Sequence, residues 1–241
     1  MRFYLKISNM KDVILFDLGN TLVRYYEKSE FPEILRESIT DVYNYLNLAS
    51  NASLQDVWQR VKDEDHESKD YQVRPLEDRL VRIFELVDPP EDFMMALCRC
   101  FMKPIFGRST IYDDTLASLS DLKAMGFRMA IVSNTAWGSP AELWREEIKR
   151  FNLHKYVDFN VFCRDVDWRK PSERIFEFTL KKMNVSAEQC IFVGDDPRWD
   201  IIGPRNVGIG AILIDRKGVF QNIEEQRITS LRELSDRLKV R

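Results

Sequence analysis

The chain of 241 residues carries a formal net charge of −3 and contains 44% hydrophobic residues, enough apolar material to build a buried core. This balance gives no electrostatic footprint for nucleic acid or an anionic membrane surface, and no apolar run approaches the roughly 20 residues of a transmembrane helix. The opening stretch MRFYLKISNM is too short and too polar for a signal peptide, so residues 1–9 form either an extra strand or an upstream extension.

Short apolar, β-branched runs predict five strands. They are almost continuously apolar rather than alternating, as expected for strands that are covered on both faces. Helical patterns separate most of them: residues 113–126 end at a glycine, residues 172–184 begin one residue after Pro171, and residues 228–241 form a final helix. Strands that alternate with helices predict an α/β fold with a doubly wound parallel sheet. The predicted strands cover residues 13–16, 129–133, 159–163, 191–194 and 211–215.

Between Arg24 and Phe106 no run has the pattern of a strand, and helical patterns follow one another instead. One of them begins with a Ser-x-x-Asp capping signal, and the last two begin with proline and acidic residues. We therefore expect an all-helical insertion over residues 23–106, with residues 1–22 and 107–241 forming the core domain. The helical patterns cover residues 32–46, 53–61, 75–87 and 90–102.

The cysteines and histidines exclude several kinds of chemistry. His66 and His154 lie far from any candidate nucleophile, which excludes Ser–His and Cys–His catalysis. The cysteines have no paired spacing of the kind that binds a metal, and we interpret them as small core residues in a reducing, cytoplasmic compartment. They are Cys98, Cys100, Cys163 and Cys190.

Polar residues follow the ends of the predicted strands. Asp17 closes the first strand, and Ser133 closes the second. Asp195 and Asp196 follow the fourth, whereas Lys170 precedes the helix after the third. Ligand sites in open parallel sheets form beyond the carboxyl ends of the strands, near the point where the strand order reverses. We therefore expect these side chains to converge on one crevice.

The segments FDLGNTL, IVSNT, RKPSERIF and FVGDDPRWD resemble, in this order, the four motifs of the haloacid dehalogenase (HAD) superfamily. The resemblance covers nearly the whole chain except the helical insertion. It implies a Rossmann-like core with a helical cap, and a hydrolase that forms an aspartyl-phosphate. It also implies catalytic roles for Asp17, Ser133 and Lys170, substrate contacts from Ser133, Asn134 and Lys170, and a Mg²⁺ ion held by Asp17, Asp195, Asp196 and the backbone carbonyl of Gly19.

The residue types fit this chemistry on physical grounds. Two like charges about 4 Å apart cost about 4 kcal/mol at an effective dielectric constant near 20. Asp17, Asp195 and Asp196 packed together therefore call for a divalent cation that prefers oxygen ligands, such as Mg²⁺. One oxygen of Asp17 would hold the metal while the other attacks phosphorus. Ser133 and Lys170 would bind the oxygens of the transferring phosphoryl group.

Gly19 departs from the motif. HAD phosphatases usually have a second aspartate at this position, which protonates the leaving group and later activates water. Glycine can do neither, and general acid–base catalysis is worth roughly 10²–10⁴-fold. We therefore expect poor hydrolysis of alkyl esters, no phosphomutase activity, and better turnover of aryl or acyl phosphates, whose leaving groups are acidic.

Residues beside the motifs keep two interpretations each. Asp200 either orients a neighbouring side chain or begins a helix. Thr21 either contributes to the site or forms a structural hydrogen bond within the first turn. Arg24, Tyr25 and Tyr26 either contact substrate or form the hinge to the cap.

The leading hypothesis is a Mg²⁺-dependent phosphatase acting on a small phosphorylated metabolite, with the cap as the specificity element. One alternative is a metal-independent 2-haloacid dehalogenase, whose carboxylate substrate would meet Asp195 and Asp196 with nothing to neutralise them. The other is a non-catalytic scaffold, which the intact Asp17, Lys170 and Asp195 disfavour. The sequence leaves the substrate and the oligomeric state open.

Overall fold

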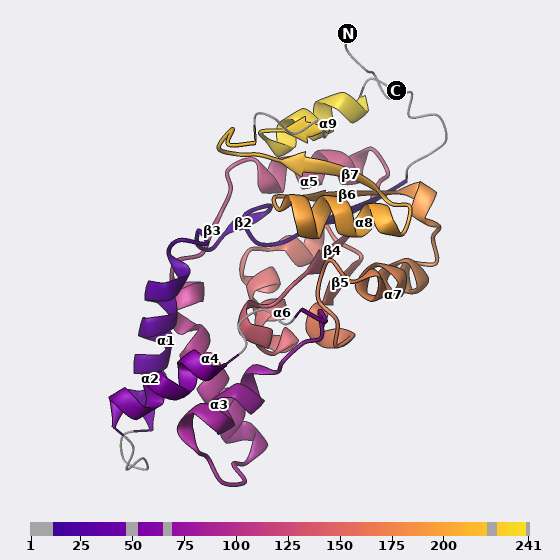
Figure 1. Cartoon of the computed structure of the whole chain (residues 1–241). Coiled ribbons are helices and arrows are strands. Elements are labelled where there is room, and N and C mark those ends of the chain that lie inside the picture. Colours follow the sequence, from indigo (N-terminus) through magenta and orange to yellow (C-terminus); the bar gives the residue numbers. More distant parts are fainter. Residues whose placement is uncertain (1–11, 47–52, 65–68, 221–225, 240–241) are drawn as a thin grey trace.

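The computed structural model describes residues 12–46, 53–64, 69–220 and 226–239 (Figure 1). The suggested extra strand or extension over residues 1–9 lies outside the described residues. A six-stranded parallel sheet in the order β5-β4-β1-β6-β7-β8 forms the centre of the larger lobe. Its strands are β1 (Val13–Phe16), β4 (Arg128–Ser133), β5 (Phe159–Phe162), β6 (Cys190–Gly194), β7 (Gly210–Ile214) and β8 (Arg227–Ile228).

Helices cover both faces of this sheet: α5 (Thr115–Ala124), α6 (Ala141–Arg150), α7 (Glu173–Met183), α8 (Gly203–Asn206) and α9 (Leu231–Lys239). Ile14 and Phe16 of β1 pack in one hydrophobic cluster with side chains of α5, α6 and α9. Val13 and Leu15 pack in a second cluster with side chains of α7. All four side chains are buried, which explains why this strand is apolar without alternation. The doubly wound α/β prediction and its five strands are confirmed.

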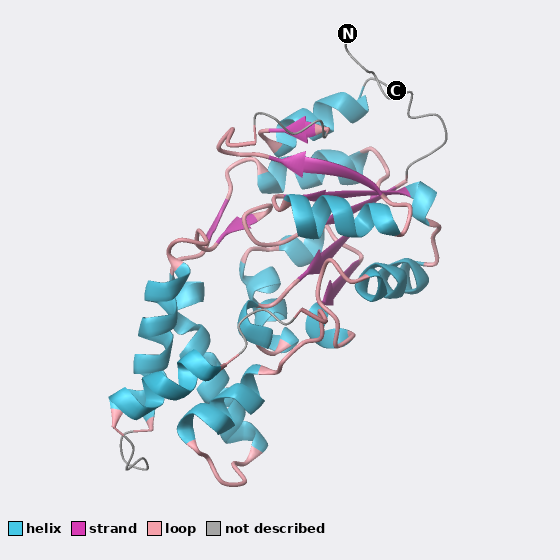
Figure 2. Cartoon of the chain, viewed as in Figure 1, coloured by secondary structure: helices cyan, strands magenta, loops and turns pink. Residues whose placement is uncertain are grey.

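A second lobe, called here the helical lobe, consists of α1 (Phe31–Tyr45), α2 (Leu54–Asp63), α3 (Leu76–Phe84) and α4 (Glu91–Gly107). Figure 2 shows it as helices joined by loops at one side of the sheet lobe. The predicted cap of α2 is present, because the Ser53 hydroxyl accepts a hydrogen bond from the Asp56 backbone N–H at 3.2 Å. Helix α1 packs along α4, and the two labelled helices lie side by side in Figure 1.

The chain passes between the lobes through two short strands, β2 (Val23–Arg24) and β3 (Thr110–Ile111), which pair antiparallel. These strands and β8 were not predicted, because two residues are too few to show a hydrophobic period. Helix α6 was also missed, and α4 continues to Gly107 through Pro104 rather than ending at residue 102. The assignment of residues 23–106 to the cap stays a proposal.

The cysteines are small side chains of the packed interior, as predicted: Cys98, Cys163 and Cys190 are buried, Cys100 is partly exposed, and all four are free thiols. Among the residues that the structure describes, no helix is both long and apolar enough to cross a membrane.

Candidate active site

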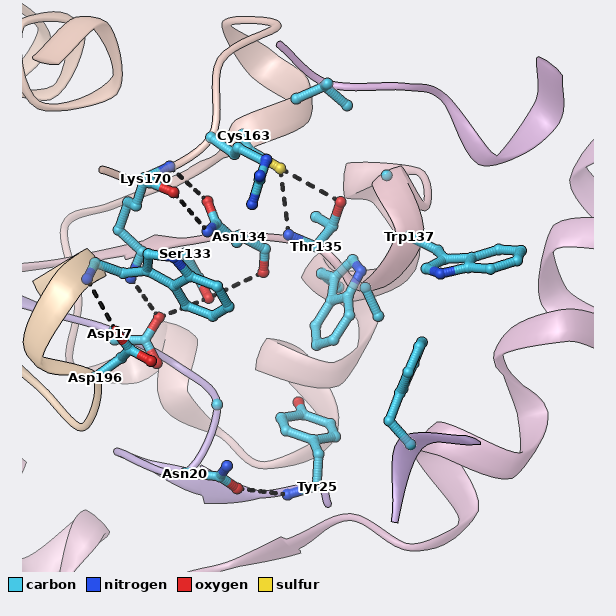
Figure 3. A pocket seen from close by; sticks show the side chains of 18 of the residues that line it. Asp17, Asn20, Tyr25, Ser133, Asn134, Thr135, Trp137, Cys163, Lys170 and Asp196 are labelled. Atoms are coloured by element: carbon cyan, nitrogen blue, oxygen red, sulfur yellow. Dashed lines mark hydrogen bonds and ion pairs between the residues drawn. The ribbon is translucent and has the colours of Figure 1, made fainter. Parts of the chain in front are cut away.

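The ends of neighbouring strands bring three of the predicted residues together. Strand β1 pairs with β4, so Asp17, directly after β1, lies beside Ser133 at the end of β4. The Ser133 hydroxyl donates to Asp17 Oδ1 at 2.9 Å, and the Lys170 ammonium donates to the same oxygen at 2.6 Å. Figure 3 shows these side chains turned toward one another at one end of the pocket. The predicted convergence of Asp17, Ser133 and Lys170 is therefore observed.

Lys170 supplies a fixed positive charge. Its side chain is 1% exposed and forms ion pairs of 2.6 Å with both Asp17 and Asp200. Burial by itself lowers the pKa of Lys170, but the negative charges of Asp17 and Asp200 outweigh it and raise the pKa above the usual lysine value. The ammonium is thus held in its charged form, as the binding of an anionic phosphoryl group requires.

An acidic cluster lies beside this lysine. Asp17, Asp195 and Asp200 each place a carboxylate oxygen within 4.8 Å of the others. Burial, followed by the charges of Asp17 and Asp200, raises the pKa of Asp195 well above its ordinary value. A divalent cation with oxygen ligands relieves such repulsion, so the donor set fits Mg²⁺. Asp17 and Asp195 are the residues that would hold it, and Gly19 lines the same pocket.

Asp200 belongs to this cluster and not only to the helix that follows. Its Oδ1 accepts from Lys170, and its Oδ2 accepts from the Asp196 backbone N–H at 3.0 Å. Burial raises the pKa of Asp200 to about 6, even though Lys170 acts in the opposite direction. Both oxygens are therefore engaged in orienting neighbours, the first of the two interpretations above. Glycine at position 194 leaves room for the Asp200 side chain, because a Cβ there would lie 2.4 Å from Asp200 Cγ.

The structure does not bring Asp196 into the acidic cluster. One carboxylate oxygen accepts from the backbone N–H groups of Arg198 and Trp199 at 2.9 and 3.0 Å. The other forms an ion pair of 2.7 Å with Lys28, which comes from the segment leading into the helical lobe. The Asp196 carboxylate thus caps the π-helical turn Pro197–Ile202 and contacts the segment that leads into the helical lobe. Its role as a metal ligand stays a prediction.

Asn134 forms two hydrogen bonds with the backbone of Lys170. Its Oδ1 accepts from the Lys170 N–H at 2.8 Å, and its Nδ2 donates to the Lys170 carbonyl at 3.2 Å. Both ends of the amide are therefore used to position the lysine, as the dashed lines in Figure 3 show. The predicted contact of Asn134 with substrate stays a prediction.

Sequence reasoning missed the role of Asn20. Its backbone has φ = 56°, a left-handed conformation that asparagine tolerates. Its side chain accepts from the Tyr25 N–H at 3.4 Å and donates to the Tyr26 carbonyl at 3.1 Å. Asn20 therefore connects the segment that leads into the helical lobe to the loop that carries Asp17. The Gly-Asn pair signals a tight turn in the sequence, but not these partners.

Two further residues lie beside the site. Of the two interpretations of Thr21, the structural hydrogen bond is not observed, because its hydroxyl is buried and forms no hydrogen bond with any described residue. Lys28 was not recognised as a site residue, because its partner Asp196 lies 168 positions away in the sequence. No local pattern could have revealed that pair.

A pocket of about 470 Å³ extends from Asp17 toward the helical lobe. Its lining combines both lobes: Arg74 and Arg79 come from the inserted segment, and Trp137 and Arg169 come from the sheet lobe. In Figure 3 Trp137 lies at the end of the pocket opposite Asp17. The nucleophile candidate is therefore at the base of a cavity whose upper walls the helical lobe completes.

Comparisons with known proteins agree with this geometry. A glyceraldehyde 3-phosphate phosphatase of Methanocaldococcus jannaschii is 28% identical over 94% of this chain and 96% of its own length. Another, of Methanothermobacter thermautotrophicus, is 35% identical, but the match spans only 43% of this chain and 44% of that protein. The crystal structure of a HAD phosphatase from Thermococcus onnurineus superposes with a TM-score of 0.64 at 23% identity, covering 94% of this chain and 97% of the other, and so shows the same fold. The model of the haloacid dehalogenase-like hydrolases matches residues 11–208, and the chain belongs to this family of hydrolases.

Proposed function

We propose that this hydrolase is a Mg²⁺-dependent phosphatase that cleaves a small phosphate ester through an aspartyl-phosphate on Asp17. The observation that carries the proposal is the state of the Asp17 carboxylate. Ser133 and Lys170 both donate to Oδ1, while Oδ2 forms no hydrogen bond with any described residue. An oxygen without a hydrogen bond, next to a fixed ammonium, suits nucleophilic attack on a phosphorus atom.

The reaction proceeds in two displacements. In the first, an oxygen of Asp17 bonds to phosphorus and the bond to the ester oxygen breaks. The leaving oxygen takes the electron pair, and because Gly19 offers no acid it takes its proton from solvent only after it has left the pocket. In the second, water attacks phosphorus, loses its proton to solvent, and releases inorganic phosphate from Asp17. Ser133 and Lys170 bind the phosphoryl oxygens in both steps.

The metal has a defined part in this proposal. When bound, Mg²⁺ would neutralise the acidic cluster and draw charge from a phosphoryl oxygen. Asp17 and Asp195 would hold it, with Asp200 keeping Lys170 in place. The crowding of Asp17, Asp195 and Asp200 supports the proposal: burial and the charges of the other two raise the pKa of Asp195, and a divalent cation would relieve this repulsion.

The similar protein of Methanocaldococcus jannaschii is a glyceraldehyde 3-phosphate phosphatase, which supports a small substrate for this chain as well. We assign residues 23–106 to a cap that closes over the pocket and excludes water during the first displacement. The four free thiols are consistent with a reducing, cytoplasmic environment.

The acidic cluster also weighs against a metal-independent dehalogenase. A carboxylate substrate would meet Asp195 and Asp200 at the position where a negative group is least stable.

The test uses purified protein with p-nitrophenyl phosphate, in Mg²⁺ and in EDTA, and with the Asp17→Asn variant. We expect hydrolysis that requires Mg²⁺ and that falls to background in the variant. Chloride release from 2-chloropropionate is measured in parallel. Chloride release that is indifferent to EDTA would replace the phosphatase by the dehalogenase. No activity in either assay, together with no Mg²⁺ binding, would favour a non-catalytic scaffold.

A further inference from the structure

The pocket beyond Asp17 is larger than a phosphoryl group with a few carbons requires. Its volume of about 470 Å³ falls within the range of roughly 300–1,000 Å³ typical of sites for whole small molecules. Its lining is rich in aromatic side chains, which come from both sides of the pocket: Tyr25, Tyr26, Phe31, Trp137, Trp144 and Trp199.

These rings hold one another in place. Tyr25 and Trp144 form an edge-to-face pair with ring centres 5.2 Å apart, and the Trp144 indole N–H donates to Ser139 Oγ at 2.9 Å. Trp137 stacks on Phe101 of α4, with centres 5.4 Å apart. The walls are therefore a fixed aromatic surface, which a flat ring can contact with little loss of side-chain entropy.

Three of the cationic side chains at the pocket, Lys28, Arg74 and Arg79, already have acidic partners. Arg74 pairs with Asp70 at 2.8 Å, and Arg79 pairs with Glu64 at 3.2 Å. A second anionic group on the substrate would have to compete with these carboxylates. The part of the substrate beyond its phosphate is therefore better suited to be uncharged.

Gly19 restricts the ester oxygen itself. A Cβ at this position would contact only the Tyr25 ring, at 3.8 Å, so no acidic side chain occupies the place beside Asp17 that this residue leaves open. The leaving group must then depart without a proton from residue 19. Phenols tolerate this far better than alkyl alcohols, because a phenolate is the weaker base.

Together these observations identify a substrate class. We infer, on the basis of the proposed phosphatase function, that the substrate is an aryl phosphate: the monoester of a phenol whose uncharged ring packs on the aromatic walls. The bond from an oxygen of Asp17 to phosphorus forms as the bond from phosphorus to the phenolic oxygen breaks. The phenolate leaves with the electron pair and takes its proton from solvent.

The first test measures binding rather than turnover. Calorimetry on the Mg²⁺-loaded protein compares three phosphonates that cannot be hydrolysed: benzylphosphonate, propylphosphonate and 3-phosphonopropionate. We expect benzylphosphonate to bind about tenfold more tightly than propylphosphonate, since aromatic contacts are worth about 0.5–1.5 kcal/mol beyond the area they bury. We expect no advantage for the second negative charge of 3-phosphonopropionate.

Matched variants locate the effect. Trp199→Leu removes a ring of the pocket wall and should reduce the tenfold preference to about threefold or less. Trp168→Leu is the control. Trp168 is also partly exposed, and its ring centre lies 3.9 Å from the guanidinium carbon of Arg174, but it does not line the pocket.

Each contrary result overturns a defined part of the inference. Equal affinity for benzylphosphonate and propylphosphonate, in a protein whose hydrolysis of p-nitrophenyl phosphate still requires Asp17, would remove the aryl class and leave the phosphatase. Tightest binding of 3-phosphonopropionate would replace it by a substrate with two anionic groups. Failure of all Mg²⁺-dependent hydrolysis would remove the phosphatase itself, and the aryl class with it.

Discussion

At the scale of single residues, the proposed mechanism makes Gly19 the position that limits how the leaving group departs. The position has room for a larger residue, because its φ lies outside the left-handed region and a Cβ would come no closer than 3.8 Å to the Tyr25 ring. We expect Gly19→Asp to raise kcat for an alkyl ester such as glycerol 3-phosphate by roughly 10²–10⁴-fold, through proton donation to the leaving oxygen.

The measurement is kcat for glycerol 3-phosphate and for p-nitrophenyl phosphate, in parallel. The gain should be confined to the alkyl ester, since a nitrophenolate needs no proton to leave. Gly19→Asn is the control of nearly equal size without an acidic proton. An equal gain from Asn would show that packing, not proton transfer, limits the rate.

In the proposed mechanism Asn134 would act on catalysis through the backbone of Lys170. Its two hydrogen bonds, of 2.8 and 3.2 Å, fix the segment from which the ammonium reaches Asp17. We expect Asn134→Ala to lower kcat about tenfold to a hundredfold with a smaller change in KM, because the lysine would be misplaced rather than removed. Asn160→Ala, which loses one hydrogen bond from Arg145 outside the pocket, is the matched control. Equal kinetic effects of the two substitutions would remove the positioning role.

At the scale of secondary-structure elements, Asp114 joins two helices to the first motif. Its carboxylate accepts from the Leu231 N–H at the start of α9 at 2.8 Å and pairs with Arg216 at 3.0 Å. Arg216 in turn donates to the Thr21 carbonyl at 2.7 Å. We expect Asp114→Asn to lower the free energy of unfolding by about 2–4 kcal/mol, because the Arg216 charge would lose its partner.

The same group predicts a dependence on pH. Burial alone would raise the pKa of Asp114, but the hydrogen bonds from Arg216 and Leu231 outweigh it and lower the pKa below its usual value. The stabilisation is therefore complete above the unfolded-state pKa near about 4, and it is lost as the pH falls through the folded-state pKa. Urea unfolding at pH 7 and pH 3 should show a smaller loss of stability on acidification in Asp114→Asn than in the parent. Identical losses would contradict this assignment.

At the scale of the whole molecule, contacts across the lobes join the walls of the pocket. Glu77 of α3 pairs with Arg164 at 2.8 Å, and Arg99 of α4 pairs with Glu146 of α6 at 2.5 Å. The backbone is also tightly packed at Gly138, where a Cβ would lie 2.1 Å from the Arg74 carbonyl oxygen. Any side chain at position 138 therefore has to displace the segment that carries Arg74.

This geometry predicts the effect of Gly138→Ala. Gly138 has φ = +69° and Gly126 has φ = +88°, but a Cβ at Gly126 meets no atom within 4 Å. Both alanine variants should lose about 1 kcal/mol of stability from backbone strain. Only Gly138→Ala should also raise KM, about tenfold, because the Arg74 segment that lines the pocket would be displaced. A parallel rise in KM for Gly126→Ala would show that the strain, not the contact between lobes, is responsible.

Much of the fold could be predicted from the sequence. Strands buried on both faces are continuously apolar, and helices repeat their apolar positions with a period near 3.6, so β1 and α2 were found from local pattern alone. The motif order also predicted that Asp17, Ser133 and Lys170 would meet, since the carboxyl ends of parallel strands lie at one edge of the sheet. Strands of two residues, such as β2, show no period and were missed.

What the sequence alone determined, then, is the chemistry available at the strand ends, because residue type and order along the chain fix which groups can reach that edge. Only the tertiary structure decided their partners: Asp200 rather than Asp196 lies with Asp17 and Asp195, and Asp196 pairs with Lys28 instead. The aromatic lining of the pocket could not be predicted from the sequence either, since Tyr25 and Trp144 come into contact only when both lobes are in place. Side-chain direction and the pairing of distant segments depend on packing in three dimensions, which no local period records.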